Sequence, residues 1–251
     1  LGFEAVRALA EAGAEVVMAA RNQDKAASAR DDILRRNPGS RVTVAELDLA
    51  SLDSVRGFVD SLDRPRLDLL INNAGVMGTP EQATADGFEL QFGTNHLGHF
   101  VLTAGLMPAL LRSDSSRVVS VTSFARLYRG RGWATGVGPY DTWREYGRSK
   151  MANLLFAREL DRRLRRTEAT VRSLAAHPGF THTDLQARSV RESGGFSQKF
   201  FHAAVQRVGM TPAEGVASIL RAATDPTARG GEFYGPRFST TRWAAARGAA
   251  S

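Results

Sequence analysis

The chain has 251 residues, of which 43% are hydrophobic and 24% are charged, and its formal net charge is +7. This composition is ordinary for a globular domain with a sizeable core, and it argues against a disordered or fibrous protein. The sequence contains no cysteine. It therefore has no disulfide bond, no thiolate metal site and no cysteine nucleophile.

The basic excess is compatible with a surface that binds nucleic acid or anionic lipid. The basic residues are spread along the chain, however, and the densest cluster, residues 162–166, lies late in a predicted helix, where positive charge is favourable. We therefore expect no nucleic-acid partner. The longest apolar stretch, residues 100–111, is too short to span a bilayer, and no signal peptide opens the chain. We expect a cytoplasmic protein without a membrane span.

Short apolar runs alternate with amphipathic stretches along the chain. The pattern predicts helices over residues 1–12, 23–36, 52–62, 87–112, 146–166 and 212–224. It predicts strands over residues 15–20, 41–47, 67–71, 117–121, 171–176 and 232–234. This alternation indicates an α/β fold, a doubly wound parallel sheet with helices on both faces. A strand should precede the first helix in such a fold, so we expect the first strand to be absent from the given chain.

Tyr146 and Lys150 lie four residues apart in a predicted helix, within the segment YGRSK. Residues at this spacing share a helix face. A neighbouring ammonium favours the phenolate and lowers the pKa of a tyrosine, and such a pair can pass a proton to or from a substrate oxygen. An ordinary surface pair has the same spacing, so the signal depends on the other segments.

Two segments follow predicted strands at the edge where a parallel sheet presents its functional groups. Ser123 ends the run RVVSVTS, either as a catalytic hydroxyl or as a helix cap. Asn73, Ala74 and Gly75 follow the strand over residues 67–71. Small residues there allow a ring or another backbone to approach closely, although a plain turn would use the same residues.

Asn95 lies in the middle of the predicted helix over residues 87–112, within TNHLGH. An asparagine side chain competes with the helix backbone for hydrogen bonds, so a buried one has a structural or a catalytic task. The neighbouring His96 and His99 are candidate metal ligands by residue type. No carboxylate or further histidine at suitable spacing accompanies them, and we expect no metal site.

Three strand ends carry residues suited to a dinucleotide. Asp48 follows the second strand and can accept a hydrogen bond from an adenine amino group, or cap the next helix. Arg21 follows the strand over residues 15–20, where NAD-binding proteins place an acid on the ribose 2′-hydroxyl. An arginine there can instead bind a 2′-phosphate, which favours NADP(H). The segment HPGFTHT (177–183) turns sharply at its Pro-Gly pair and leaves its threonines free to contact a cofactor amide.

The segments NNAG (72–75), TNHLGHF (94–100), YGRSK (146–150) and HPGFTHT (177–183), together with Ser123, resemble the short-chain dehydrogenase/reductase family in their order and spacing. Within that family the chain is similar to the retinol-dehydrogenase-like branch. The resemblance implies one Rossmann-type domain over residues 1–237, followed by a disordered tail over 238–251. It also implies that most of the family's glycine motif is missing, with Leu1 and Gly2 as its last two positions.

The resemblance assigns a catalytic or supporting role to four of these residues. Tyr146 would be the general acid in carbonyl reduction and the base in alcohol oxidation, Lys150 would lower the pKa of that tyrosine and bind the nicotinamide ribose, and Ser123 would orient the substrate oxygen. Asn95 would support a proton relay. The implied cofactor-binding residues are Gly2, Arg21, Asp48, Leu49, Asn73, Ala74, Gly75, Tyr146, Lys150, Pro178, Gly179, Thr181 and Thr183.

The expected activity is an NADP(H)-dependent oxidoreductase that interconverts an apolar alcohol and its ketone or aldehyde. Two segments, 124–145 and 185–210, should shape an apolar substrate pocket with their aromatic and aliphatic side chains. The alternative is that these side chains only pack the loops. The side chains are those of Tyr128, Trp133, Tyr140, Trp143, Phe196, Phe200, Phe201 and Val205. The resemblance further implies a homodimer or homotetramer formed through the helices over 87–112 and 146–166. The alternative is a non-catalytic dinucleotide sensor or interaction protein on the same fold.

Overall fold

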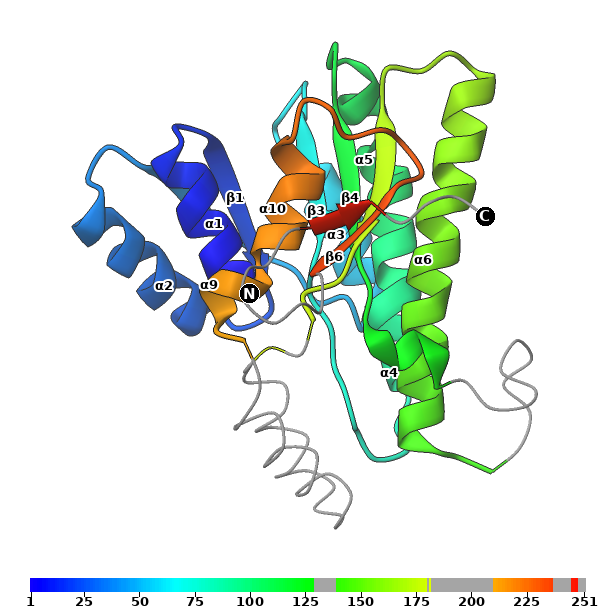
Figure 1. Cartoon of the computed structure of the whole chain (residues 1–251). Helices are drawn as coiled ribbons and strands as arrows, with labels where there is room; N and C mark the ends of the chain where they lie inside the picture. Colours follow the sequence, from blue (N-terminus) through cyan, green and yellow to red (C-terminus); the bar gives the residue numbers. More distant parts are fainter. Residues whose placement is uncertain (129–138, 180, 182–209, 237–244, 248–251) are drawn as a thin grey trace.

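A computed structural model describes residues 1–128, 139–179, 181, 210–236 and 245–247 (Figure 1). Its helices are α1 (Gly2–Glu11), α2 (Gln23–Arg36), α3 (Leu52–Ser61), α4 (Leu90–Phe92), α5 (Gly98–Leu111), α6 (Thr142–Arg166), α9 (Pro212–Gly215) and α10 (Ala217–Thr224), with a π-helix η1 (Gly93–Leu97) and a 3-10 helix η2 (Phe124–Leu127). Its strands are β1 (Glu15–Ala20), β2 (Arg41–Glu46), β3 (Leu69–Asn72), β4 (Arg117–Val121), β5 (Arg172–Ala176), β6 (Phe233–Pro236) and β7 (Ala245–Arg247).

The strands form two sheets. β1 pairs with β2 in parallel, and the larger sheet has the order β3–β4–β5–β6–β7, parallel throughout except for the antiparallel pairing of β7 with β6. The predicted fold class, a parallel α/β architecture with helices on both faces, is confirmed. The sheet is nevertheless divided, because no described strand pairs with both β1 and β3.

Three predicted helices differ from the structure at their boundaries. The helix expected over residues 87–112 begins at Leu90 and passes through η1 before α5. The helix expected from residue 146 begins one turn earlier, at Thr142, because the Asp141 side chain caps it by accepting a hydrogen bond from the backbone N–H of Arg144. The helix expected over residues 212–224 divides at Val216 into α9 and α10.

Strand β4 is buried along its whole length, as expected of a strand covered on both faces. Val118 packs in a cluster with Phe58 of α3 and Leu102 of α5. Val119 and Val121 point to the opposite face, into a second cluster. This alternation along β4 places the hydrophobic core on both sides of the larger sheet.

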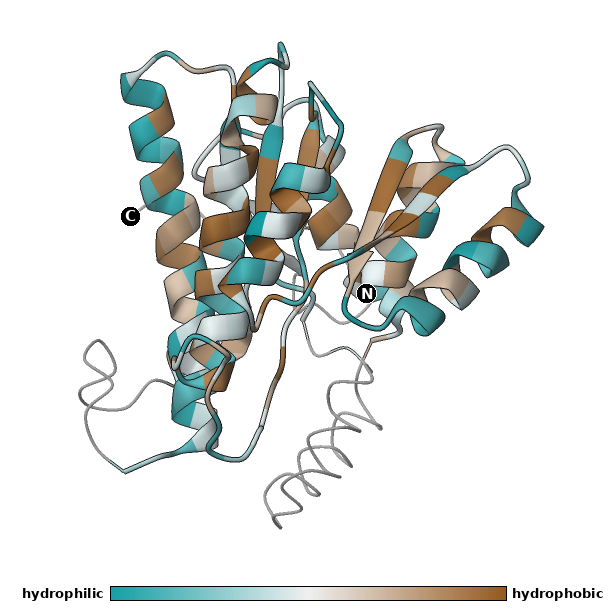
Figure 2. Cartoon of the chain, turned by 180° about the vertical axis from the view of Figure 1, so that it is seen from behind, coloured by the Kyte–Doolittle hydropathy of each residue, from teal (hydrophilic) through white to brown (hydrophobic). Residues whose placement is uncertain are grey.

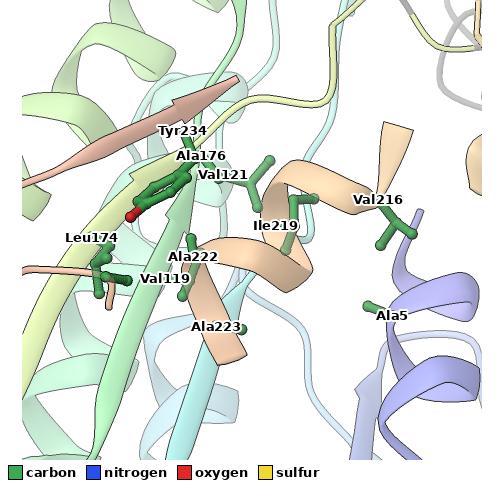
Figure 3. Close-up of a cluster of buried hydrophobic side chains, with 11 residues drawn as sticks. Ala5, Val119, Val121, Leu174, Ala176, Val216, Ile219, Ala222, Ala223 and Tyr234 are labelled. Atoms are coloured by element: carbon green, nitrogen blue, oxygen red, sulfur yellow. The ribbon is translucent and has the colours of Figure 1, made fainter. Parts of the chain in front are cut away.

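The second cluster joins α1 and α10 to the larger sheet (Figure 3). Ile219 of α10 packs there with Leu174 of β5 and Tyr234 of β6, and Ala5 of α1 completes the cluster. Another side of α1 packs with Val16 of β1 in a separate cluster. Helix α1 therefore contacts the strands of both sheets.

Hydrophobic residues concentrate on the strands, whereas much of α6 carries hydrophilic residues (Figure 2). This distribution follows from burial of the sheet beneath helices whose outer sides face water. Among the described residues, no helix is both long and apolar enough to cross a membrane.

Candidate active site

The carboxyl ends of β3, β4 and β5 meet at one edge of the larger sheet, at the end of the molecule where α4 and the beginning of α6 lie (Figure 1). The loop with Asn73 and Gly75 follows β3, Ser123 follows β4, and Pro178 follows β5. Ligands of parallel α/β sheets bind at this edge. The candidate site is therefore built by segments that are far apart in the sequence.

The side chains of Tyr146 and Ser123 meet at this edge. Tyr146 lies in the second turn of α6 and is 7% exposed, and the Ser123 side chain is near enough to its hydroxyl to favour the charged form of the phenol. The Ser123 oxygen also accepts a hydrogen bond of 3.2 Å from the backbone N–H of Ala125, which caps η2. Ser123 therefore caps η2 and also lies at the Tyr146 phenol, because the same side chain makes both contacts.

Lys150 lies one turn further along α6 and is 5% exposed. Its Nζ lies 5.7 Å from the centre of the Tyr146 ring and donates one long hydrogen bond, of 3.4 Å, to the carbonyl oxygen of Val121. An ammonium can donate more than one hydrogen bond, and the described residues give Nζ no other. A buried cation with donors to spare fits a ligand rich in hydroxyl groups, such as the ribose of a dinucleotide.

Burial controls the pKa values of this pair. It raises the pKa of the Tyr146 phenol to about 12, and the hydrogen bond with Ser123 acts in the opposite direction more weakly. It lowers the pKa of the Lys150 ammonium to about 8. The sequence predicted that Lys150 would lower the pKa of Tyr146. In this structure the direction is opposite, because loss of hydration disfavours the charged form of each group.

Asn95 is completely buried in the π-helix η1. Its side chain exchanges two hydrogen bonds with the backbone of Val76, of 2.7 and 2.9 Å, and donates a third, of 2.9 Å, to the Ser149 hydroxyl of α6. Every polar atom of the side chain is thus engaged in holding the loop after β3 against α6. The next loop residue inward, Gly75, lies so close that an added Cβ would be 2.8 Å from Asn95 Oδ1 and 3.3 Å from Lys150 Nζ.

The N-terminus of α1 lies beside the loop after β3. A Cβ added at Gly2 would be 2.9 Å from Asn73 Nδ2, and Leu1 at the N-cap provides no side-chain cap. Ala74, the next loop residue, is exposed. Free N–H groups at a helix start attract phosphate, so this arrangement suits the diphosphate of a dinucleotide.

The turn after β5 lies close to α9. Gly179 has a φ of 74°, which only glycine adopts without strain, and its N–H donates to His177 Nδ1 at 3.1 Å. Thr181 is buried, and its hydroxyl donates to the carbonyl oxygen of Pro178 at 2.8 Å. The remaining predicted threonine, Thr183, lies outside the described residues.

The three residues predicted near the adenosine half have different surroundings. The Asp48 carboxylate accepts from the backbone N–H of Ala50 at 2.9 Å. The Leu49 side chain is 6% exposed and packs against Gly98 in the hydrophobic core. Arg21 is exposed at the end of β1, and no hydrogen bond or ion pair of its guanidinium occurs within the described residues.

The described aromatic residues that were predicted to shape the substrate pocket have different surroundings. Trp143 packs edge-on against Tyr146, with ring centres 6.4 Å apart, whereas Tyr128 is 63% exposed. Tyr140 donates to the carbonyl oxygen of Thr79 at 2.8 Å. The other predicted pocket residues, namely Trp133, Phe196, Phe200, Phe201 and Val205, lie outside the described residues.

The two histidines of TNHLGHF make structural contacts. His99 Nδ1 lies 2.9 Å from the carbonyl oxygen of Asn95, and His96 Nδ1 lies 3.2 Å from Asn153 Oδ1. Burial lowers the pKa of His99 to about 4. The His99 contact is therefore internal to the η1–α5 segment, whereas the His96 contact connects this segment to α6.

Two residues near the site were missed from the sequence. Arg126 donates a hydrogen bond of 3.0 Å to the carbonyl oxygen of Ser123, and its guanidinium lies 4.7 Å from the centre of the Phe233 ring. Gln91 is completely buried between α6 and the loop after β3. The signal for Gln91 was its position four residues before Asn95, on the same face of the predicted helix; Arg126 had no comparable signal.

The family model for short chain dehydrogenase matches residues 1–194. The chain therefore belongs to the short-chain dehydrogenase family, in agreement with the sequence prediction.

Among its relatives are two proteins from Homo sapiens. Retinol dehydrogenase 13 is 40% identical over 192 residues, which are 74% of this chain and 57% of the relative. Retinol dehydrogenase 14 is 38% identical over an alignment of 254 positions, which covers 94% of this chain and 74% of the relative. The chain thus spans less than two thirds of the length of the first relative.

Solved structures show the same architecture. An uncharacterised protein from Mycobacterium Paratuberculosis is 39% identical, with a TM-score of 0.66 over 95% of this chain and 78% of the other. A gluconate 5-dehydrogenase from Burkholderia cenocepacia, solved in complex with NADP and tartrate, has a TM-score of 0.67 over 92% of this chain and 87% of the other. At 20% identity, this second similarity concerns the fold.

Proposed function

We propose that this protein is an NADP(H)-dependent oxidoreductase that interconverts an apolar alcohol and its ketone or aldehyde. The observation that carries the proposal is the meeting of a phenol, an ammonium and a hydroxyl at the carboxyl edge of the sheet: Tyr146 with Ser123 at its hydroxyl, and Lys150 one turn along α6. The cofactor, when bound, supplies or accepts the hydride. The chain itself positions the substrate oxygen and moves the proton.

Each of the three side chains has one task in carbonyl reduction. The phenol of Tyr146 stays protonated at neutral pH, since burial raises its pKa to about 12, so it can donate the proton to the substrate oxygen. The Ser123 hydroxyl donates a second hydrogen bond to that oxygen. Lys150 binds the ribose through its spare donors and, as a nearby cation, stabilises the phenolate that remains after proton transfer.

Arg21 supports NADP(H) as the cofactor. It is exposed at the end of β1, and its side chain has no partner within the described residues, so its guanidinium is available to a 2′-phosphate. The names of the relatives, retinol dehydrogenases 13 and 14, support an apolar alcohol or its carbonyl as the substrate. Trp143, packed against Tyr146, is consistent with an apolar surface near the reacting group. A non-catalytic sensor on the same fold is less well supported, because such a protein has no need of the three converging groups.

The full-length protein with Tyr146→Phe tests the proposed activity. Loss of the proton donor should reduce NADPH-dependent carbonyl reduction by at least about a hundredfold, while the dissociation constant for NADPH changes little because the ring remains. The measurement is the decrease in NADPH absorbance with a panel of apolar aldehydes and ketones, together with a fluorescence titration of NADPH. Turnover of the variant at the wild-type rate would remove Tyr146 from the reaction.

Arg21→Ala tests the cofactor preference. Because a bidentate guanidinium–phosphate pair is worth about 1.5–3 kcal/mol, the variant should bind NADPH on the order of tenfold to a hundredfold more weakly, with NADH binding almost unchanged. Arg41, exposed but bound to the carbonyl oxygen of Gly13, provides the control: Arg41→Ala should affect neither cofactor selectively. An equal loss of affinity for both cofactors in the Arg21 variant would exclude Arg21 from the phosphate site.

We further propose that the protein forms a homodimer or homotetramer through α5 and α6. Phe100 of α5 is 49% exposed and Leu155 of α6 is 47% exposed, although both side chains are large and apolar. Phe100 also contacts Phe156 of α6, with ring centres 5.5 Å apart, so the two helices present one continuous apolar surface. Such surfaces support association between protein molecules.

A further inference from the structure

Gln91 is completely buried, and every polar atom of its side chain has a partner. Its Oε1 accepts a hydrogen bond of 2.9 Å from the backbone N–H of Gly78. Its Nε2 donates to the carbonyl oxygen of Thr142 at 2.9 Å and lies 3.3 Å from the Thr142 hydroxyl and 3.2 Å from the Tyr140 hydroxyl. One amide thus joins the loop after β3 to the beginning of α6.

A second set of hydrogen bonds parallels this connection. The hydroxyls of Tyr140 and Thr142 both donate to the carbonyl oxygen of Thr79, at 2.8 and 2.9 Å. The beginning of α6 is therefore attached to residues 78–79 directly through two hydroxyls and indirectly through the Gln91 amide. This polar network has few alternative arrangements around Gln91, because a broken bond of this completely buried amide would leave a polar group unpaired.

The two connected segments both lead into the candidate site. Thr142 is the first residue of α6, one turn before Tyr146. Gly78 lies three residues beyond Gly75, which approaches Lys150. Four residues after Gln91, Asn95 connects the same loop, at Val76, to Ser149 of the same helix.

We infer that Gln91 is a positioning residue, which fixes the first turns of α6 against the loop after β3 and thereby sets the Tyr146 hydroxyl relative to Ser123 and Gly75. The inference rests on the proposed function. Gln91 itself touches neither Tyr146 nor Lys150 in the described contacts, so it acts through the backbone of α6. Proton and hydride transfer are sensitive to displacements of about 1 Å, which a loosened helix start would allow.

The test compares Gln91→Glu and Gln91→Met in the full-length protein. The glutamate keeps an acceptor for Gly78 but places a carboxylate against the Thr142 carbonyl oxygen, and the methionine keeps the volume but removes all the hydrogen bonds. Both should lower kcat for NADPH-dependent carbonyl reduction by about tenfold or more, while the dissociation constant for NADPH changes by less than about threefold. Hydrogen exchange, followed by mass spectrometry, should accelerate at residues 76–80 and 140–147 and remain unchanged in α2.

Tyr140→Phe is the milder variant in case the Gln91 variants fold poorly. It removes one hydroxyl from the same network and should produce the same changes with smaller size, about threefold in kcat. Ser116→Ala is the matched control. Its hydroxyl is also completely buried and donates to the carbonyl oxygen of Leu110 at 2.8 Å, but it lies at the opposite end of β4. This variant should lose thermal stability without a change in kcat.

The inference is overturned if the Gln91 variants lose stability as Ser116→Ala does while kcat and exchange at residues 140–147 stay at their wild-type values. Failure of the proposed function gives a different result: the wild-type protein itself then turns over none of the carbonyl compounds. In that case the exchange experiment still decides whether Gln91 fixes the start of α6. Accelerated exchange confined to the two segments supports its positioning role, and unchanged exchange refutes it.

Discussion

At the scale of single residues, the central feature is a buried phenol beside a buried ammonium. Burial is the largest influence on both pKa values: it raises that of Tyr146 to about 12, against a weaker opposite effect of Ser123, and lowers that of Lys150 to about 8. The phenol is thus neutral across the physiological range, whereas the lysine loses its proton within reach of that range. In the proposed function, Tyr146 therefore donates the proton and the charge on Lys150 modulates this step.

The lowered pKa of Lys150 predicts a pH dependence. Lys150 is protonated below about pH 8 and neutral above it. Because carbonyl reduction leaves a phenolate that the ammonium stabilises, kcat for reduction should fall as the pH rises through about 8. An unperturbed lysine, with a pKa of 10.5, would place the fall more than two units higher. The measurement is the initial rate at saturating substrate from about pH 6.5 to about pH 9.5. A flat profile would contradict the proposed role of Lys150.

The sequence predicted the convergence of Ser123, Tyr146 and Lys150 through the order and spacing of the segments that resemble the short-chain dehydrogenase/reductase family, because each local pattern is ambiguous by itself. It did not predict the direction of the Tyr146 pKa shift. That direction depends on how deeply the Tyr146 side chain is buried. The side chain is 7% exposed, and its burial is set by the packing of segments that are distant in the sequence. For the same reason Leu49, expected at the adenine, lies in the core: a hydrophobic residue after a strand does not reveal which way it points.

At the scale of elements, the close packing of α6 on η2 is the feature that places Ser123 beside Tyr146. Gly147 allows this contact. An added Cβ at Gly147 would overlap the carbonyl oxygen of Tyr128 and lie 2.5 Å from that of Ala125. The two carbonyl oxygens belong to backbone and have no freedom to move independently of η2.

Gly147→Ala should therefore displace η2 from α6 and reduce kcat by about tenfold or more, with a loss of roughly 1–3 kcal/mol in the free energy of unfolding. Gly57→Ala in α3 is the control, because a Cβ there meets no atom within 4 Å. It should be neutral or stabilise the protein by about 0.5–1 kcal/mol, as alanine does inside a helix. Thermal unfolding and steady-state rates measure both. Equal behaviour of the two variants would show that the contact with η2 is not critical.

The element boundaries that were wrong have local physical causes. The hydrophobic period predicted one helix over residues 87–112, but Glu89 caps a new start by accepting from the backbone N–H groups of Gln91 and Phe92. The π-helix that follows accommodates the bonds of Asn95 to Val76 and Ser149. Periodicity gives no signal for such tertiary hydrogen bonds, so the inner elements of this segment could not be located from the sequence.

At the scale of the whole molecule, the parallel sheets and their helix layers were predictable, because strand and helix patterns alternate clearly. The domain limits of 1–237 and the cytoplasmic location remain predictions. The apolar surface on α5 and α6 is the whole-molecule feature that leads to a test.

Leu155→Arg should dissociate the proposed homodimer or homotetramer. Leu155 is 47% exposed, so a charged side chain is tolerated in a single subunit but opposes an identical one across a symmetric interface. Light scattering after size-exclusion chromatography should show a mass near that of one chain for the variant and a multiple of it for the wild type. Val59→Thr in α3 is the control. The Val59 side chain packs near Gly105 of α5, away from Leu155, and this variant should keep the wild-type mass. A monomeric wild type would refute the proposed assembly.

The divided sheet also affects how the protein associates with other molecules. Within the described residues, β1 pairs only with β2 and β3 only with β4, so each has one row of backbone N–H and C=O groups without a strand partner. Such rows are templates for strand addition from other molecules. Preparations of the protein should consequently aggregate less at low concentration, where strand pairing between molecules is rare.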